Sequence, residues 1–144
     1  MELNSLSFIA FIEAPNSQCV GGFIFGLEGG VKMKINQANA IRLWEDFYGD
    51  KEYAEDFHGN LMYKYAYGNE DYYIVEYGVK IYCGWNIHHI LPKLHGGSNA
   101  KNNLICTNII TNESASDKIT YWIDDTLYQV RKIFGTHEYE IVEL

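Results

Sequence analysis

The pattern of apolar and polar positions predicts a β-hairpin and a helix in the first fifty residues. Apolar residues dominate 20–27 and 31–35, on either side of the turn-forming sequence Glu28-Gly29-Gly30, which favours a hairpin. From 37 to 48 apolar residues return every three or four positions, as they do along one face of a helix. Asn36 precedes this stretch and is a suitable N-cap, so we expect the helix to begin there.

A second hairpin is expected in the tyrosine-rich centre of the chain. The acidic stretch 50–56 predicts a solvated helix or loop. Alternating residues in 61–67 and 72–77 flank Gly68-Asn69, which predicts two paired strands, and 79–83 predicts a further strand. Most of the twelve tyrosines lie in this region, and we interpret them as half-buried sheet and surface residues rather than as a platform for stacking bases.

The C-terminal third begins with strand-like residues and ends with a predicted helix and an edge strand. A helix over 113–134 is indicated by apolar residues that recur at intervals of three and four, with Gly135 as its stop: Ile119, Trp122, Ile123, Leu127 and Val130. The weak alternation of 137–144 predicts an edge strand. The pattern as a whole is that of an α+β protein.

Composition limits the class of protein and suggests two modules. The chain has 144 residues, 47% of them apolar, without an apolar run long enough to span a membrane. Three cysteines without a Cys-x-x-Cys pair favour a reducing, cytoplasmic setting. The net charge is −8, of which −7 lies in residues 1–79 and −1 in residues 80–144. We therefore expect an acidic α+β module at 1–79 and a second module at 80–144. The acidity argues against a simple basic protein that coats nucleic acid, but because most of it lies in 1–79 it does not exclude an anionic partner for 80–144.

The segment 85–112 contains the residues most suited to chemistry. His88 and His89 are adjacent at the end of an apolar, strand-like run, so their side chains should point to opposite faces. One can then bind a metal while the other faces a substrate or the interior. Pro92 ends the strand and Gly96-Gly97 provides a tight turn, after which strand character resumes at Asn103. Asn112 is a plausible N-cap for the next helix.

This segment resembles the HNH endonuclease family. The resemblance rests on His-His-Ile-x-Pro-x-x-x-Gly-Gly, then Asn103-Leu104, then Asn112, and it covers about a quarter of the chain. It implies the ββα-metal fold, packed here on the N-terminal hairpin and helix module. It also implies that His88 and Asn112 bind the metal, that His89 is the general base and that Asn103 orients the base and its loop.

The chain departs from many members of that family at the positions of a structural zinc site. Asn108 and Thr111 stand where those members have a Cys-x-x-Cys pair, and Cys83 is alone upstream. The resemblance therefore implies Mg²⁺ as the cofactor, with Mn²⁺ as its substitute, and no structural zinc. The N-terminal half is then expected to stabilise this small motif by packing.

The implied activity is hydrolysis of DNA phosphodiester bonds, with Lys93, His95 and Lys118 as candidate phosphate contacts. A plainer interpretation is that Lys93 and Lys118 are solvent-exposed surface lysines and that His95 is a loop histidine without a functional role. Two other functions stay open: a nucleic-acid or protein binding module with weak or lost catalysis, and an effector subunit of a larger phage or defence complex. The acidity favours a homodimer or a protein partner that brings the DNA.

Overall fold

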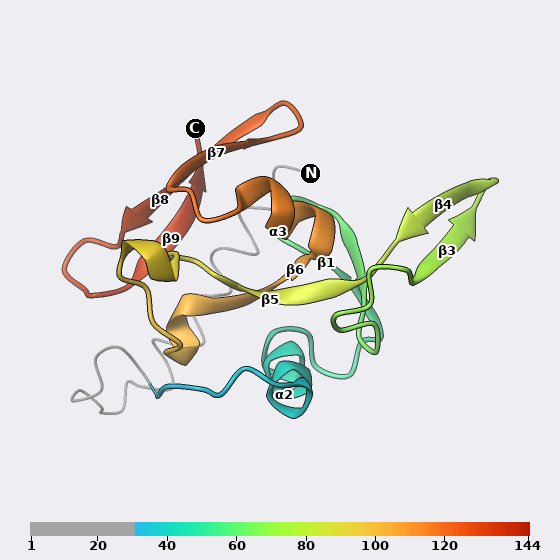
Figure 1. Ribbon diagram of the computed structural model, residues 1–144, viewed down its shortest axis with the longest axis horizontal. Helices are drawn as coiled ribbons and strands as arrows, with labels where there is room; N and C mark the ends of the chain where they lie inside the picture. The colour runs from blue at the N-terminus through green and yellow to red at the C-terminus, as the bar shows by residue number, and fades with distance from the viewer. Residues whose placement is uncertain (1–30) are drawn as a thin grey trace.

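The structure is a computed structural model that describes residues 31–144. This part of the chain mixes helices with antiparallel strand pairs (Figure 1), as the sequence pattern predicts. The two α-helices of the described residues are α2 (Gln37–Tyr48) and α3 (Ile109–Ala115). The strands are β1 (Tyr53–Glu55), β2 (Leu61–Tyr63), β3 (Tyr73–Glu76), β4 (Val79–Tyr82), β5 (Trp85–His89), β6 (Leu104–Asn108), β7 (Thr120–Ile123), β8 (Thr126–Lys132) and β9 (Tyr139–Glu143).

The helix α2 has the bounds that its sequence predicts, because both of its ends are fixed locally. The side chain of Asn36 caps the first turn by accepting a 2.8 Å hydrogen bond from the Asn39 backbone N–H. Gly49 ends the helix with a φ of 66°, in the range that glycine adopts at low cost. The buried face of the helix carries Leu43 and Trp44, which pack on the β5–β6 pair.

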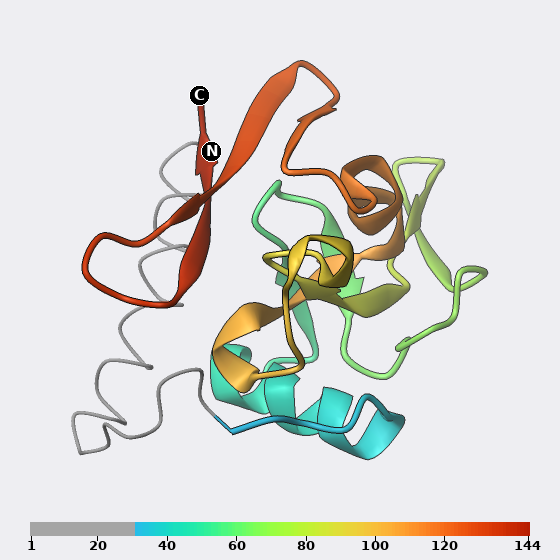
Figure 2. The same cartoon turned by 60° about the vertical axis from the view of Figure 1, so that its left-hand side comes forward.

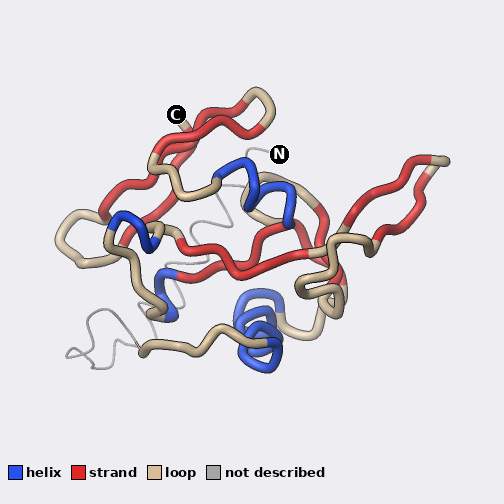
Figure 3. Tube along the Cα trace, viewed as in Figure 1, coloured by secondary structure: helices blue, strands red, loops and turns tan. Residues whose placement is uncertain are grey.

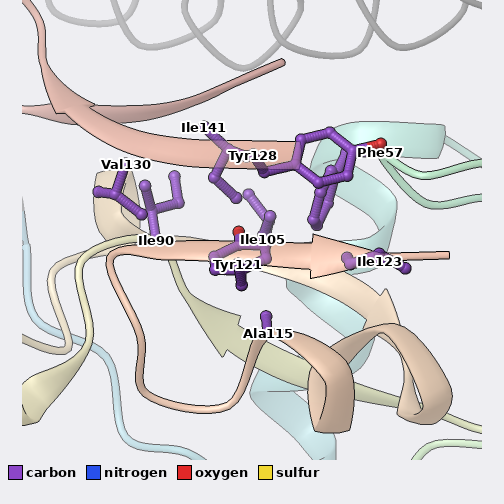
Figure 4. Packing of buried hydrophobic residues seen from close by; sticks show 9 residues of the cluster. All are labelled: Phe57, Ile90, Ile105, Ala115, Tyr121, Ile123, Tyr128, Val130 and Ile141. Carbon is purple, nitrogen blue, oxygen red and sulfur yellow. The ribbon is translucent and has the colours of Figure 1, made fainter. Parts of the chain in front are cut away.

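The β5–β6 pair lies between two apolar clusters, with α2 on one side and α3 and the β7–β8–β9 sheet on the other (Figures 1 and 2). Its antiparallel register sets His88 opposite Ile105 and His89 opposite Leu104. Ile105 belongs to the cluster that Figure 4 shows, in which it faces residues of the three-stranded sheet. Leu104 belongs to the other cluster, beside α2. The ends of β5 and β6 are therefore held firmly from both sides.

The predicted hairpin around Gly68-Asn69 is wrong. The strand β2 pairs with β1, which lies in the acidic stretch expected to be a helix or loop, and β3 pairs with β4. Gly68 and Asn69 do form a turn, but this turn packs against β5: the Gly68 N–H donates to the Trp85 carbonyl oxygen at 2.7 Å. A Cβ atom on Gly84 would lie 2.0 Å from the Asn69 carbonyl oxygen, so this close approach requires glycine.

The predicted helix over 113–134 is also wrong. The helix α3 ends at Ala115, and β7 and β8 follow as a hairpin whose turn contains Asp124 (Figure 3). In β7 the exposed and buried residues alternate, so the apolar spacing of three and four is shared by two strands. The turn is fixed by His58, whose Nε2 lies 2.8 Å from Asp124 Oδ2 and whose Nδ1 lies 2.8 Å from the Tyr128 hydroxyl.

The C-terminal strand β9 forms one edge of the β7–β8–β9 sheet, as predicted. Gly135 lies in the turn before it, with a φ of 81°, and does not end a helix. The hairpin predicted over 20–35 lies mostly outside the described residues, although Lys32 forms a β-bridge with Ala100. The boundary expected near residue 80 falls within the β3–β4 hairpin. None of the helices in 31–144 is long and apolar enough to cross a membrane.

Candidate functional site

The end of β5 and the middle of α3 bring His88 and Asn112 together. His88 Nδ1 lies 2.6 Å from Asn112 Oδ1, although the residues are 24 positions apart in the chain. Because an amide oxygen only accepts, Nδ1 donates this hydrogen bond and the lone pair of the neutral imidazole is on Nε2. His88 is buried, and burial, aided by the charge of the neighbouring His89, lowers the pKa of His88 to about 4. Its ring is therefore neutral at physiological pH.

The sequence context of Asn112 predicts that it is the N-cap of its helix, and this prediction is wrong. It lies within α3, whose N-cap is Asn108: the Asn108 Oδ1 accepts a 2.8 Å hydrogen bond from the Ile110 N–H. The amide of Asn108 also donates to the carbonyl oxygens of Leu61 and Tyr82, at 2.8 and 2.9 Å. These bonds join the start of α3 to β2 and β4, so they fix the direction in which the helix presents Asn112.

Asp56 is a buried hydrogen-bond acceptor that joins the start of α3 to the turn that follows β1. One of its carboxylate oxygens accepts from the backbone N–H groups of His58 and Asn60, and the other from the Asn108 N–H at 2.9 Å. Thr111 also hydrogen-bonds to it, and accepts from the Asn60 amide at 2.8 Å. Burial raises the pKa of Asp56, and these four hydrogen bonds oppose the shift. Sequence reasoning missed Asp56, because it lies in an acidic stretch that predicts only a solvated helix or loop.

His89 pairs with a residue that the sequence pattern does not single out. His89 Nε2 lies 2.7 Å from Asn99 Oδ1. The amide oxygen requires a proton on Nε2, which leaves Nδ1 of the neutral ring as a proton acceptor. The backbone of Asn99 is itself held, because its carbonyl oxygen accepts a 2.8 Å hydrogen bond from the Met33 N–H. His89 is half-buried, so its ring has a fixed orientation and partial contact with solvent.

Asn103 closes the loop between β5 and β6. Its Oδ1 accepts from the Leu91 N–H at 2.8 Å, and its Nδ2 donates to the carbonyl oxygens of Leu91 and Ser98, each at 3.0 Å. A Cβ atom on Gly97 would lie 1.7 Å from the Leu91 carbonyl oxygen, so the loop closes this tightly only with glycine there. Asn103 thus orders the backbone that leads from His89 to Asn99.

The three candidate phosphate contacts lie on exposed turns. Lys93 and His95 belong to a short 3-10 turn (Lys93–His95) in the β5–β6 loop, and both are exposed. Lys118 lies beyond the end of α3 in the connection to β7, rather than within the helix predicted over 113–134. Within 31–144, neither Lys93 nor Lys118 forms an ion pair, whereas Lys101 pairs with Asp46. Among the described residues, Lys93, His95 and Lys118 form no hydrogen bond or ion pair with His88 or Asn112.

The donors at this site are few and mostly neutral. The described residues contain no group of three or more His, Cys, Asp or Glu side chains that could hold a metal. The two side chains that the structure brings together, His88 and Asn112, offer one imidazole nitrogen and one amide oxygen as possible metal ligands. Comparisons of the chain with protein-family models, with curated proteins and with solved structures give no match.

Proposed function

We propose that this protein is a metal-dependent endonuclease of the HNH type that hydrolyses DNA phosphodiester bonds. The observation that supports it best is the 2.6 Å contact of His88 Nδ1 with Asn112 Oδ1. These are the two residues to which the resemblance gives the metal. In this proposal β5, its loop, β6 and α3 form the ββα-metal motif, with Asn103 in the central position that orders the loop.

The donor set fits a hard divalent cation. His88 Nδ1 and Asn112 Oδ1 are already adjacent, and they would hold a cation between them if the ring proton of His88 were carried on Nε2 instead of Nδ1. Water and phosphate oxygens complete the coordination of Mg²⁺ in sites with few protein ligands. When bound, Mg²⁺ or Mn²⁺ would supply Lewis-acid stabilisation of the charge that develops on the phosphate and on the leaving oxygen. The low pKa of His88, about 4, keeps the ring neutral, so that one of its two nitrogens has a lone pair available for a cation.

The chain's own residues then provide the proton transfer and the positioning. His89 Nδ1 accepts the proton of the water that attacks the phosphorus, because Asn99 holds the proton of the ring on Nε2. Asn103 orients the loop that carries Asn99, and so acts on His89 through the backbone. Lys93, His95 and Lys118 are proposed to contact neighbouring phosphates. One such site cuts one strand.

The polar cluster at Asp56 supports the same proposal. Asn108 and Thr111 stand at the positions where many HNH proteins have the cysteines of a structural zinc site. In this chain both are fully buried and hydrogen-bonded to Asp56. A network of buried hydrogen bonds between β2, β4 and α3 is a physical alternative to a metal cross-link, since each satisfied buried bond stabilises the folded state.

Nicking of supercoiled plasmid DNA in Mg²⁺ or Mn²⁺ tests the proposal. We expect the wild-type protein to nick and His89→Ala to lose this activity while keeping its circular dichroism spectrum and its unfolding midpoint. His137→Ala is the matched control, because His137 is an exposed histidine in the β8–β9 turn. Equal nicking by wild type and His89→Ala would show that the activity belongs to a contaminant or to another site, and would refute the role of His89.

A second candidate, a binding module without catalysis, is favoured by the small neutral donor set. The described residues contain no group of three or more His, Cys, Asp or Glu side chains that could hold a metal, and the pair in contact, His88 and Asn112, is neutral. This candidate predicts that Mn²⁺ and DNA bind with equal affinity to wild type and to His89→Ala, and that neither protein cuts DNA. The nicking experiment therefore separates the two functions.

A further inference from the structure

The hairpin of β3 and β4 projects away from the rest of the described chain (Figure 1). We call residues 73–82 the arm. Its two strands pair only with each other, and three or more strands are normally needed for a hairpin to be stable alone. Apolar and aromatic side chains nevertheless lie exposed along both strands and at the tip: Tyr73, Val75, Tyr77, Val79 and Tyr82. Such a concentration of exposed apolar residues marks an interaction surface.

The tip of the arm supports this interpretation. Tyr77 and Gly78 form the turn with φ angles of 52° and 79°, the combination for which Asn-Gly is the favoured sequence. Tyrosine is uncommon at a positive φ, and here its side chain is 102% exposed. The side chain of Tyr77 therefore makes no contact within the described residues that would offset this strain. Residues with a strained backbone concentrate at functional sites, such as those that clamp a ligand, so the strain at Tyr77 is consistent with a role in binding.

Four more tyrosines lie at the base of the arm and account for the tyrosine-rich composition of this region. The ring of Tyr72 stacks on Tyr63 with centroids 4.7 Å apart, and its hydroxyl lies 3.0 Å from that of Tyr53. Tyr65, which is exposed, contacts Tyr63 edge-on at 5.7 Å. Held rings of this kind lose little conformational entropy on binding, which explains why tyrosine is enriched in protein-recognition surfaces.

The charge of the surface selects the kind of partner. Residues 70–82 contain Glu70, Asp71 and Glu76 against Lys80, a net charge of −2. The ammonium group of Lys80 lies over the Tyr73 ring, 4.6 Å from its centroid, and so is already engaged. Nucleic acid would be repelled by these carboxylates, because binding to phosphates depends on Lys and Arg. A second copy would present the same acidic arm, on a chain whose net charge is −8.

We propose that the arm and the tyrosines at its base dock into a protein partner that has an apolar groove bordered by Lys and Arg. The apolar side chains and the tip tyrosine fill the groove, and the carboxylates pair with the basic border. This surface is carried by β3 and β4, whereas the proposed nuclease site is on β5, β6 and α3. The inference therefore stands independently of the proposed function.

Site-specific photo-cross-linking tests the proposal in the full chain. The photoreactive residue p-benzoylphenylalanine replaces Tyr77 in cells that make the protein naturally, and replaces Phe134 in a control, since Phe134 is 100% exposed on a different hairpin. We expect one protein to cross-link at position 77 and not at position 134. Recovery of no specific protein at position 77, or of nucleic acid there, would overturn the proposal.

Binding by the purified cross-linked protein is the decisive measurement. We expect its Kd for the wild-type chain to rise with NaCl concentration, and to rise about tenfold or more for Tyr77→Asn and Val75→Ser, but not for Phe134→Ser. Asparagine adopts a positive φ readily, so Tyr77→Asn removes the ring without unfolding the arm. Equal affinity of the arm variants would refute the proposal, as would a wild-type homodimer that Tyr77→Asn converts to a monomer in light scattering.

Discussion

His88 Nδ1 and Asn112 Oδ1 lie 2.6 Å apart, in a hydrogen bond that joins the end of β5 to the middle of α3. The bond is possible because α3 begins at Ile109, directly after β6, with Asn108 as its N-cap, so that its first turn returns toward β5. The Asp56 cluster fixes that start. The proposed metal ligands are therefore positioned by the fold before any cation binds, which reduces the entropy lost on binding.

Substitution of Asn112 should change metal affinity. We expect Asn112→Ala to weaken Mn²⁺ binding about tenfold or more, because it removes one of two protein donors, and Asn112→Asp to strengthen it through added charge. Electron paramagnetic resonance of free Mn²⁺ measures the bound fraction. Asn102→Ala is the matched control, since Asn102 lies on the neighbouring 3-10 turn (Lys101–Asn103). Unchanged binding by Asn112→Ala would remove Asn112 from the metal site.

Substitution of Asn99 should slow nicking through His89. Without the 2.7 Å hydrogen bond to Asn99, the proton of the His89 ring is free to move between Nε2 and Nδ1, and only one of these tautomers leaves Nδ1 as the base. We expect Asn99→Ala to lower kcat about tenfold with KM for DNA unchanged. Nitrogen-15 NMR of His89 reports the tautomer directly, so the positioning can be verified even in a protein that does not cut DNA. A wild-type tautomer in Asn99→Ala would argue against this role.

Substitution of Asn103 should destabilise the whole fold. Its side chain makes three hydrogen bonds to the backbone of the loop, and Asn103→Ala leaves these groups without partners in a buried position. We expect a loss of about 2–4 kcal/mol in the free energy of unfolding, measured with urea. Asn102→Ala, one residue away, should change it by less than about 0.5 kcal/mol. Similar values for the two variants would show that the loop does not depend on Asn103.

Local sequence patterns predicted the elements whose ends are fixed by neighbouring residues. The helix α2 is set by the Asn36 cap and by Gly49, and both act within a single turn. The strand β5 is short, apolar and followed by Pro92, so its position could also be predicted from the sequence. The helix expected over 113–134 failed because apolar residues spaced by three and four also fit two strands joined at Asp124. There the decision depends on packing against distant segments, including His58.

Of the residues at the candidate site, only those that fit the spacing of the HNH pattern could be predicted from the sequence. His88, His89, Asn103 and Asn112 follow from such a spacing, and the structure places His88 in contact with Asn112. Asn99 and Asp56 do not follow from it, because their roles depend on tertiary partners. The contacts of Asp56 come from its own turn, from the N-cap of α3 and from Thr111, three features that no local pattern connects.

The buried His88 should make stability depend on pH. Its pKa is about 4 in the folded protein and 6.5 in an unfolded chain, so the unfolded chain binds a proton that the folded protein does not as pH falls below 6.5. This contribution to stability is fully present above pH 6.5 and is lost progressively as pH falls to 4. We expect the difference in unfolding free energy between wild type and His88→Gln to narrow by about 2–3 kcal/mol from pH 7 to pH 4.5. Parallel stability curves for the two proteins would contradict the burial of a neutral His88.

Substitution of Tyr77 should stabilise the protein while it removes a side chain from the proposed docking surface. Tyr77 has a φ of 52° and no contact that would offset the strain of this conformation. Asparagine tolerates a positive φ, so we expect Tyr77→Asn to raise the free energy of unfolding by about 0.5–1 kcal/mol. Tyr77→Val is the opposing control, because a β-branched residue is strongly disfavoured there and should lower stability. If Tyr77→Asn instead destabilised the protein, the ring would have a structural role, and its exposure could no longer be explained by binding to a partner.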